Sequence, residues 1–223
     1  YEKIGFITKP DRQTNGYRIF TQLQLEQCRL IRLAMKAEVL QNGLRKMAVE
    51  IVRLCAALSF DDAKAARRDY CYMIESELIN ARAAIRAVED ILHQKSPIET
   101  PGILRQEAAK RLGVTPETLR TWERSGLLLV KRHKNGYRIY NAEDMRRLNI
   151  IRTLRCANYS LSAIQRLMGE LDRNADCTIE DALNLPRTDE DIVSVCDRLI
   201  VSLQNALEDA KGLLPMIEEM AEI

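Results

Sequence analysis

Aromatic residues are scarce in this chain of 223 residues: they make up 5 %, with a single tryptophan. So few rings suit helices that pack through Leu, Ile and Ala. No apolar run reaches the roughly 18 residues that a membrane span needs, so we expect no membrane contact. The six cysteines lie at positions 28, 55, 71, 156, 177 and 196, and no two of them form a C-x-x-C pair. A disulfide framework is therefore not expected, and a reducing, cytoplasmic location is.

Sequence motifs of catalysis are also missing. We find no G-x-S-x-G, P-loop, H-E-x-x-H or supported pair of carboxylates. His93 and His133 stand alone, far from any cysteine pattern. We therefore expect no enzyme activity, no metal site and no cofactor. Cys71 and Cys196 hold equivalent places on two long predicted helices, and a buried structural role is favoured over a thiol or metal sensor.

The charge is unevenly placed, although the net charge is only +2. Residues 102–155 hold 13 Lys/Arg against 5 Asp/Glu, whereas residues 170–223 hold 4 Lys/Arg against 14 Asp/Glu. A basic block beside an acidic block indicates that one part contacts a polyanion and the other does not.

The tetrad Asn-Gly-Tyr-Arg occurs twice, at residues 15–18 and 135–138. Each copy follows an aromatic-Glu-basic-x-Gly run, at residues 1–5 and 122–126. Because chance rarely repeats two linked motifs, we interpret the chain as an internal duplication. The repeated unit mixes basic and aromatic residues around a tight turn, which suits contact with a nucleic-acid backbone.

The second unit shows a helix-turn-helix pattern. Thr100-Pro101 predicts the start of a helix that Gly113 ends, and Thr115-Pro116 predicts a second helix to Arg124. Residues 127–130 and 137–140 then read as two strands around Asn135-Gly136, a hairpin signal with three basic residues at its tip. Such a hairpin resembles the wing of a winged helix-turn-helix.

Further helices are expected in both units from caps and apolar spacing. Their predicted ranges are 22–39, 41–58, 60–93, 141–157, 160–171 and 188–222. The last has coiled-coil spacing, and Pro215 is expected to bend its final turns. Shifted by 125 residues, 60–93 overlays 188–222. The predicted fold is thus all-α with small β wings: two winged helix-turn-helix modules, each followed by a long coiled-coil helix.

The duplication divides the chain into residues 1–93, a linker at 94–101, and residues 102–223. No counterpart of the helix-turn-helix at residues 102–121 is visible in the first unit. We expect that counterpart to lie upstream of Tyr1.

One ordered set of residues in the second unit is similar to a known family. It reads Ala108-Ala109-x-x-Leu112-Gly113-Val114-x-x-x-Thr118-Leu119-Arg120-x-Trp122-Glu123-x-x-Gly126-Leu127, then Asn135-Gly136-Tyr137-Arg138-x-Tyr140. This set resembles the MerR family of bacterial transcription regulators, and residues 1–39 resemble the same family from the end of the recognition helix onward. The resemblance implies promoter DNA as the partner, dimers joined by an antiparallel coiled coil, and bending of an over-long promoter spacer so that RNA polymerase can engage.

The resemblance also implies which residues contact DNA. Backbone contacts fall to Arg120, Trp122, Tyr137 and Arg138, with burial in the small domain as the alternative for the two aromatic side chains. Thr115, Glu117 and Thr118 begin the recognition helix, where base edges are reached. The wing tip adds phosphate contacts; its basic residues are Lys131, Arg132 and Lys134. The first-unit counterparts are Arg12, Tyr17 and Arg18.

Two assemblies and two functions stay open from the sequence. The helices at 60–93 and 188–222 could pair antiparallel within one chain, which makes a monomeric pseudo-dimer, or between chains in an ordinary homodimer with four modules. The predicted function is a transcription regulator in the bacterial nucleoid, with an unidentified small-molecule effector. The alternative is a protein that binds or sequesters a drug-like molecule between its helices.

Overall fold

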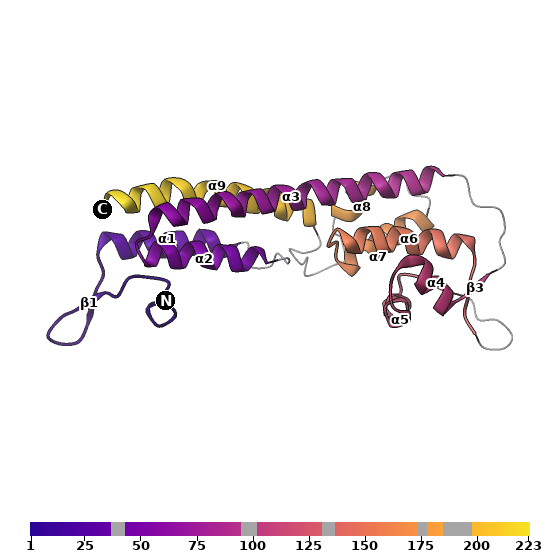
Figure 1. The fold of residues 1–223 in the computed structure, drawn as a ribbon, viewed down its shortest axis with the longest axis horizontal. Helices are drawn as coiled ribbons and strands as arrows, with labels where there is room; N and C mark the ends of the chain where they lie inside the picture. Colours follow the sequence, from indigo (N-terminus) through magenta and orange to yellow (C-terminus); the bar gives the residue numbers. More distant parts are fainter. Residues whose placement is uncertain (37–42, 95–101, 131–136, 174–177, 185–197) are drawn as a thin grey trace. The chain divides into compact units, whose positions relative to one another are not determined.

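The computed structural model describes residues 1–36, 43–94, 102–130, 137–173, 178–184 and 198–223, which form two compact units. Unit 1 holds residues 1–79 and 200–223, and unit 2 holds residues 80–199. Figure 1 labels the helices and the strands β1 and β3. Helices dominate the described residues, and the strands form two antiparallel two-stranded sheets.

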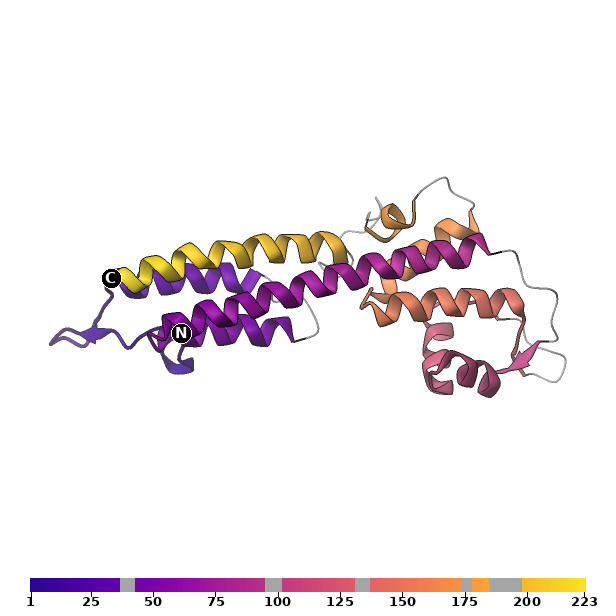
Figure 2. The ribbon, with the colours of Figure 1, turned by 45° about the horizontal axis from the view of Figure 1, so that its top comes forward.

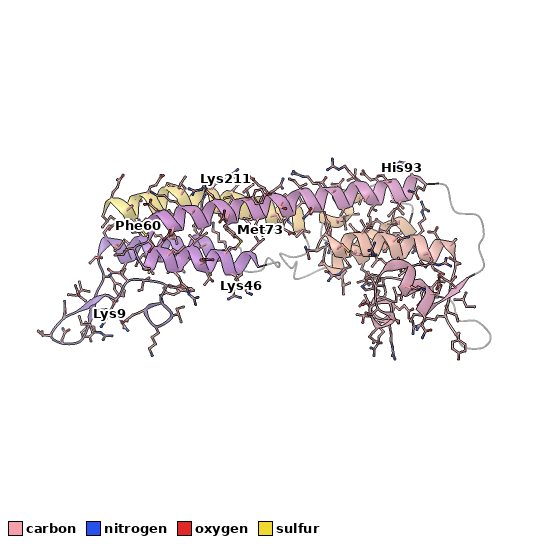
Figure 3. The ribbon with its side chains drawn as sticks, viewed as in Figure 1. Lys9, Lys46, Phe60, Met73, His93 and Lys211 are labelled. Carbon is pink, nitrogen blue, oxygen red and sulfur yellow. The ribbon has the colours of Figure 1, made fainter. Side chains whose placement is uncertain are left out.

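Unit 1 begins with short elements and continues with long helices. The short elements are η1 (Glu2–Ile4), β1 (Asp11–Arg12) and β2 (Arg18–Ile19). The helices are α1 (Gln22–Ala34), α2 (Leu44–Ala56), the first part of α3 (Phe60–His93) and nearly all of α9 (Leu199–Glu222). Phe60 and His93, labelled in Figure 3, mark the two ends of α3.

The core of unit 1 lies between these helices. α9 runs antiparallel to the first part of α3 (Figure 2), and Arg67 Nε donates to the carbonyl of Ala210 at 2.8 Å. One face of α9 is buried along its length; its residues are Leu199, Leu203, Ala206, Ala210, Leu213, Ile217 and Met220. Their spacing is the coiled-coil spacing predicted from the sequence, which is thus confirmed for the described part of the helix. Pro215 lies inside α9.

Unit 2 contains the second sheet and a further set of helices. Its elements are β3 (Ile103–Leu104), α4 (Arg105–Leu112), α5 (Pro116–Arg124), β4 (Ile139–Tyr140), α6 (Ala142–Cys156), α7 (Leu161–Asp172) and α8 (Ile179–Asn184). β3 pairs with β4, with Ile103 opposite Tyr140 and Leu104 opposite Ile139. The later part of α3 also belongs to this unit.

The later part of α3 is held by α6 and by the turn before α7. Arg146 on α6 donates to two carbonyls of the last turn of α3, Ile91 O at 3.1 Å and Leu92 O at 2.5 Å. These carbonyls have no partner inside a helix, so a guanidinium there satisfies them and complements the helix dipole. The hydroxyl of Tyr159, which is fully buried, donates to Ala81 O at 3.3 Å.

Capping signals placed several helices correctly. Thr115, Asn141 and Ser160 cap α5, α6 and α7 through the bonds from Thr118 N, Asp144 N and Ala163 N. The long helix expected at 60–93 is confirmed. A short helix, α8, was not expected in the polar stretch before residue 188. The predicted start of the last helix at 188 lies outside the described residues.

Three expectations need correction. The helix predicted from Thr100 starts at Arg105, because residues 103–104 form a strand. Residues 127–130 form no strand; the partner of β4 is β3 instead. The first helix was expected to reach residue 39, but α1 ends at Ala34, with the amide of Met35 closing onto Ile31 O.

Candidate nucleic-acid interface

α4 and α5 are joined by a tight turn at Gly113. Its φ of 65° is left-handed, a conformation that favours glycine. The Val114 amide donates to Ala109 O at 3.0 Å, which closes the end of α4. The two helices pack through buried apolar side chains; these are Ala108, Ala109, Leu112, Leu119 and Trp122. The result is a helix-turn-helix whose second helix exposes its N-terminal end.

That end of α5 carries the three predicted base readers. Thr115 Oγ1 accepts from the Thr118 amide at 3.1 Å, and the two hydroxyls lie 2.8 Å apart. Glu117 is exposed and lies 3.8 Å from Arg120, a weak surface pair. Thr115 therefore has a capping role, while Glu117 and the exposed Arg120 present their polar groups to solvent.

Trp122 differs from the other predicted contacts because it is only 5 % exposed. Its ring lies in the core beneath α4, which was the alternative expected from the sequence. Tyr137, in contrast, is 64 % exposed. The wing-tip residues Lys131, Arg132 and Lys134 lie outside the described residues.

Glu123, at the end of α5, is the main polar centre of the site. Its side chain is 3 % exposed. Arg138 Nη1 lies 2.7 Å from Oε2, Arg105 Nη2 lies 3.0 Å from the same oxygen, and the Tyr140 hydroxyl donates to Oε1. One buried carboxylate thus joins the start of α4, the end of α5 and the base of the wing.

Burial and the bond to Glu123 raise the pKa of Tyr140 to about 12. Its hydroxyl therefore remains a donor at neutral pH. Arg105 Nε lies 3.3 Å from the same hydroxyl, and that bond raises the pKa of the guanidinium further. The network is neutral at Tyr140, negative at Glu123 and positive at both arginines.

Sequence reasoning missed this network, although a signal for it was present. Glu123 and Arg138 belong to the two motifs that are repeated together, and the ion pair is their physical link. The same pair recurs in unit 1, where Arg18 Nε donates to Glu2 at 2.9 Å. This bond lowers the pKa of Glu2.

The two motifs also share backbone geometry. The amides of Gly5 and Gly126 donate to Glu2 O and Glu123 O, each at 3.1 Å, with φ of 70° and 73°. In unit 1, β1 and β2 form a hairpin around Asn15-Gly16, with Arg12 opposite Arg18. Arg12 Nη1 donates to Gly16 O at 3.1 Å, and Tyr17 is 73 % exposed.

The described residues contain no group of three or more His, Cys, Asp or Glu side chains arranged to hold a metal ion. Cys71 is half-buried, and burial raises the pKa of its thiol, which disfavours the reactive thiolate. Cys196 lies outside the described residues. Among the helices that the structure describes, none is long and apolar enough to span a membrane.

A helix-turn-helix with an exposed recognition end, flanked by the β3–β4 pair with Arg105 and Arg138 beside it, is typical of a DNA-binding regulator. Comparisons with known proteins give the family. Residues 106–171 match the MerR HTH family of regulatory proteins. The mercuric resistance operon regulatory protein of Bacillus cereus is 30 % identical over 124 residues, which are 51 % of this chain and 93 % of that protein.

Other relatives agree. The HTH-type transcriptional regulator CueR of Salmonella typhi is 24 % identical over 123 residues, 52 % of this chain and 89 % of its own. The regulator AdhR of Bacillus subtilis is 36 % identical over 80 residues, 35 % of this chain and 56 % of its own. No solved structure matches the chain. The chain belongs to the MerR family, and it is a DNA-binding transcription regulator, not an enzyme.

Proposed function

We propose that this chain is a single-chain counterpart of a MerR dimer. Residues 1–93 form one module, residues 102–223 form the other, and residues 94–101 link them. The long helices α3 and α9 are the two coiled-coil helices. The pair acts on promoter DNA by distorting it, and it acts on RNA polymerase only through that distortion.

The exchange of the long helices carries this proposal. α3 follows the first module in sequence, yet its later part is held by the second module through Arg146 and Tyr159. α9 follows the second module, yet it packs on the first: Lys36 Nζ lies 3.1 Å from Asp209. Each helix thus contacts the module that it does not follow, which is the exchange expected of two dimer halves fused in one chain.

Gly212 of α9 supports the same packing. A Cβ added at this glycine would lie 3.3 Å from Leu33 Cδ2 on α1, so the helices approach closely here. Arg67 meets the Ala210 carbonyl on another side of α9, one turn before Pro215. Proline removes a hydrogen bond from the turn that precedes it, so a side-chain donor near this turn helps to stabilise α9.

The DNA contacts follow from the exposed polar groups of the winged regions. Arg120, Tyr137 and Arg138, with the wing-tip Lys131, Arg132 and Lys134, bind phosphates of one half-site. Glu117 and Thr118 contact base edges. Thr115, as the N-cap of α5, fixes the start of the helix that carries them. The buried ring of Trp122 packs in the core beneath this surface. Arg12, Tyr17 and Arg18 take the corresponding place on the other half-site. Because the two halves differ, the operator is expected to be asymmetric.

The test combines mass with DNA stoichiometry. In solution without DNA, the protein is expected to have the mass of one chain, 25.6 kDa. On a duplex that carries the DNA upstream of its own gene, one chain is expected to bind per duplex. Binding should weaken steeply with salt, since phosphate contacts dominate. A duplex with the same composition in scrambled order is the matched control.

Two chains per duplex would agree with a transcription regulator but would refute the single-chain dimer. Binding that does not distinguish the upstream DNA from the scrambled duplex would favour the alternative, a relative that sequesters a small molecule. Bending of the bound duplex, measured by the change in its end-to-end distance, tests the proposed distortion separately.

A further inference from the structure

Glu123 is shared by two arginines in an unequal way. Arg105 is held twice, by the carboxylate at 3.0 Å and by the Tyr140 hydroxyl at 3.3 Å. Arg138 is held by the carboxylate at 2.7 Å, while its buried Nε has no hydrogen-bond partner among the residues that the structure describes. Arg105 is therefore the better satisfied of the two, and Arg138 is the one that gains more from a new acceptor.

The charges allow one arginine to leave. Two guanidinium groups face one carboxylate, and Tyr140 stays neutral, so the cluster carries one excess positive charge. The side chains of Arg105 and Arg138 are 30 % and 31 % exposed, so both reach the surface. Glu123 is 3 % exposed and cannot be left without a cation, because an unpaired buried charge is costly.

We propose that Arg138 exchanges between Glu123 and a DNA phosphate, and that Arg105 is the positioning residue that permits this exchange. When Arg138 turns to the phosphate, Arg105 keeps the buried carboxylate paired. Arg105 itself need not contact DNA. This inference rests on the proposed phosphate contact of Arg138.

Unit 1 provides an internal contrast. Arg18 pairs with Glu2, whose side chain is 26 % exposed. Water can therefore solvate Glu2 when Arg18 leaves. A second arginine is required only where the carboxylate is buried, as at Glu123.

The experiment measures how the affinity for one random-sequence duplex changes with salt concentration. Each phosphate contact contributes about 0.9 to the slope of log K against log salt. We expect Arg138→Ala to lower the slope by about 0.9. Arg105→Ala should lower it by about as much, because Arg138 is then retained by Glu123. The double variant Arg105→Ala with Glu123→Gln should recover the original slope, since the neutral amide that replaces the carboxylate no longer retains Arg138.

Two further variants control for charge and for folding. Arg111→Ala removes the same charge from the same helix, where Arg111 pairs at the surface with Glu107 at 2.8 Å, and should leave the slope unchanged. Arg105→Lys keeps a cation beside Glu123 and should keep the slope. Arg105→Lys also provides a test if Glu123→Gln prevents folding. Thermal unfolding of each variant would reveal such a failure to fold.

The outcomes separate the two proposals. If Arg138→Ala does not change the slope, the phosphate contact fails and the exchange fails with it. If Arg138→Ala lowers the slope but the double variant stays low, Arg105 contacts DNA directly and the exchange alone is refuted. A slope lowered by Arg105→Ala, kept by Arg105→Lys and recovered in the double variant supports the exchange.

Discussion

The same sequence motif is exposed in unit 1 and buried in unit 2. Trp122 is 5 % exposed, whereas Tyr1, its counterpart in the repeat, is 58 % exposed. Tyr140 is 1 % exposed, whereas Phe20 is 56 % exposed. In unit 2 these rings are covered by β3 and α4, which have no counterpart among the described residues of unit 1.

The difference separates what is local from what is not. Both motifs form the left-handed glycine turn and the arginine–glutamate pair, since these depend on neighbouring residues and on one hairpin. Burial of the rings depends on elements that pack from elsewhere in the chain. The loss of stability caused by matched substitutions in the two units should therefore differ most where the burial of the side chain differs. It should differ least at the glycine turn, which both units share.

The largest difference is expected at the aromatic start of the motif. Trp122→Ala removes a buried ring and should destabilise unit 2 by about 3–5 kcal/mol. Tyr1→Ala removes an exposed ring and should change stability by less than about 0.5 kcal/mol. Denaturant unfolding followed by far-UV circular dichroism measures both. Equal effects of the two substitutions would show that the burial difference has no energetic meaning.

A smaller difference is expected at the end of the motif. Tyr140→Phe removes the hydroxyl that donates to Glu123, and a hydrogen bond to a charged group contributes about 1.5–3 kcal/mol. Phe20→Tyr adds a hydroxyl to an exposed ring and should be neutral within about 0.5 kcal/mol. The same unfolding measurement applies. A neutral Tyr140→Phe would mean that the two arginines alone satisfy the carboxylate.

Signals in neighbouring residues predicted much of this fold. Thr115 and Asn141 placed the starts of α5 and α6, because a capping side chain bonds an amide three residues ahead. The buried stripe of α9 followed from its spacing. These features need no knowledge of the distant chain.

Pairings between distant residues were not predictable in the same way. β3 has two residues and is defined by Tyr140 and Ile139, more than thirty positions later. Nothing near Ile103 indicates that partner, and Pro101 favoured a helix instead. For the same reason the burial of Trp122 could not be decided, since a ring in an amphipathic helix suits either a core or a DNA surface.

Effects should be equal where both units share the turn. Gly5 and Gly126 have φ of 70° and 73°, and a side chain in this conformation costs about 1–2 kcal/mol. Gly5→Ala and Gly126→Ala should each destabilise their own unit by that amount. Amide hydrogen exchange, read separately for η1 and α5, measures the two effects. In Gly126→Ala the added Cβ would also lie 3.3 Å from Gln165 Nε2. A larger loss of stability than in Gly5→Ala would therefore be due to this close contact and not to the turn.

The last comparison concerns the titration of one hydroxyl. The pKa of Tyr140 is about 12 in the folded chain, against a usual value of 10.0. Because the folded value is the higher one, the stabilisation from this group is complete below pH 10 and is lost as the pH rises through about 12.

Tyr140→Phe should therefore show a smaller loss of stability between these pH values than the original chain. Tyr70, whose pKa burial also raises to about 12, lies in unit 1 and makes Tyr70→Phe the matched control for a buried hydroxyl without Glu123. Ultraviolet absorbance of tyrosinate, taken as the difference between each variant and the original chain, gives the two titrations. If the Tyr140 difference titrates near the usual value, the hydroxyl is not held by the buried carboxylate, and the contrast between the two motifs rests on packing alone.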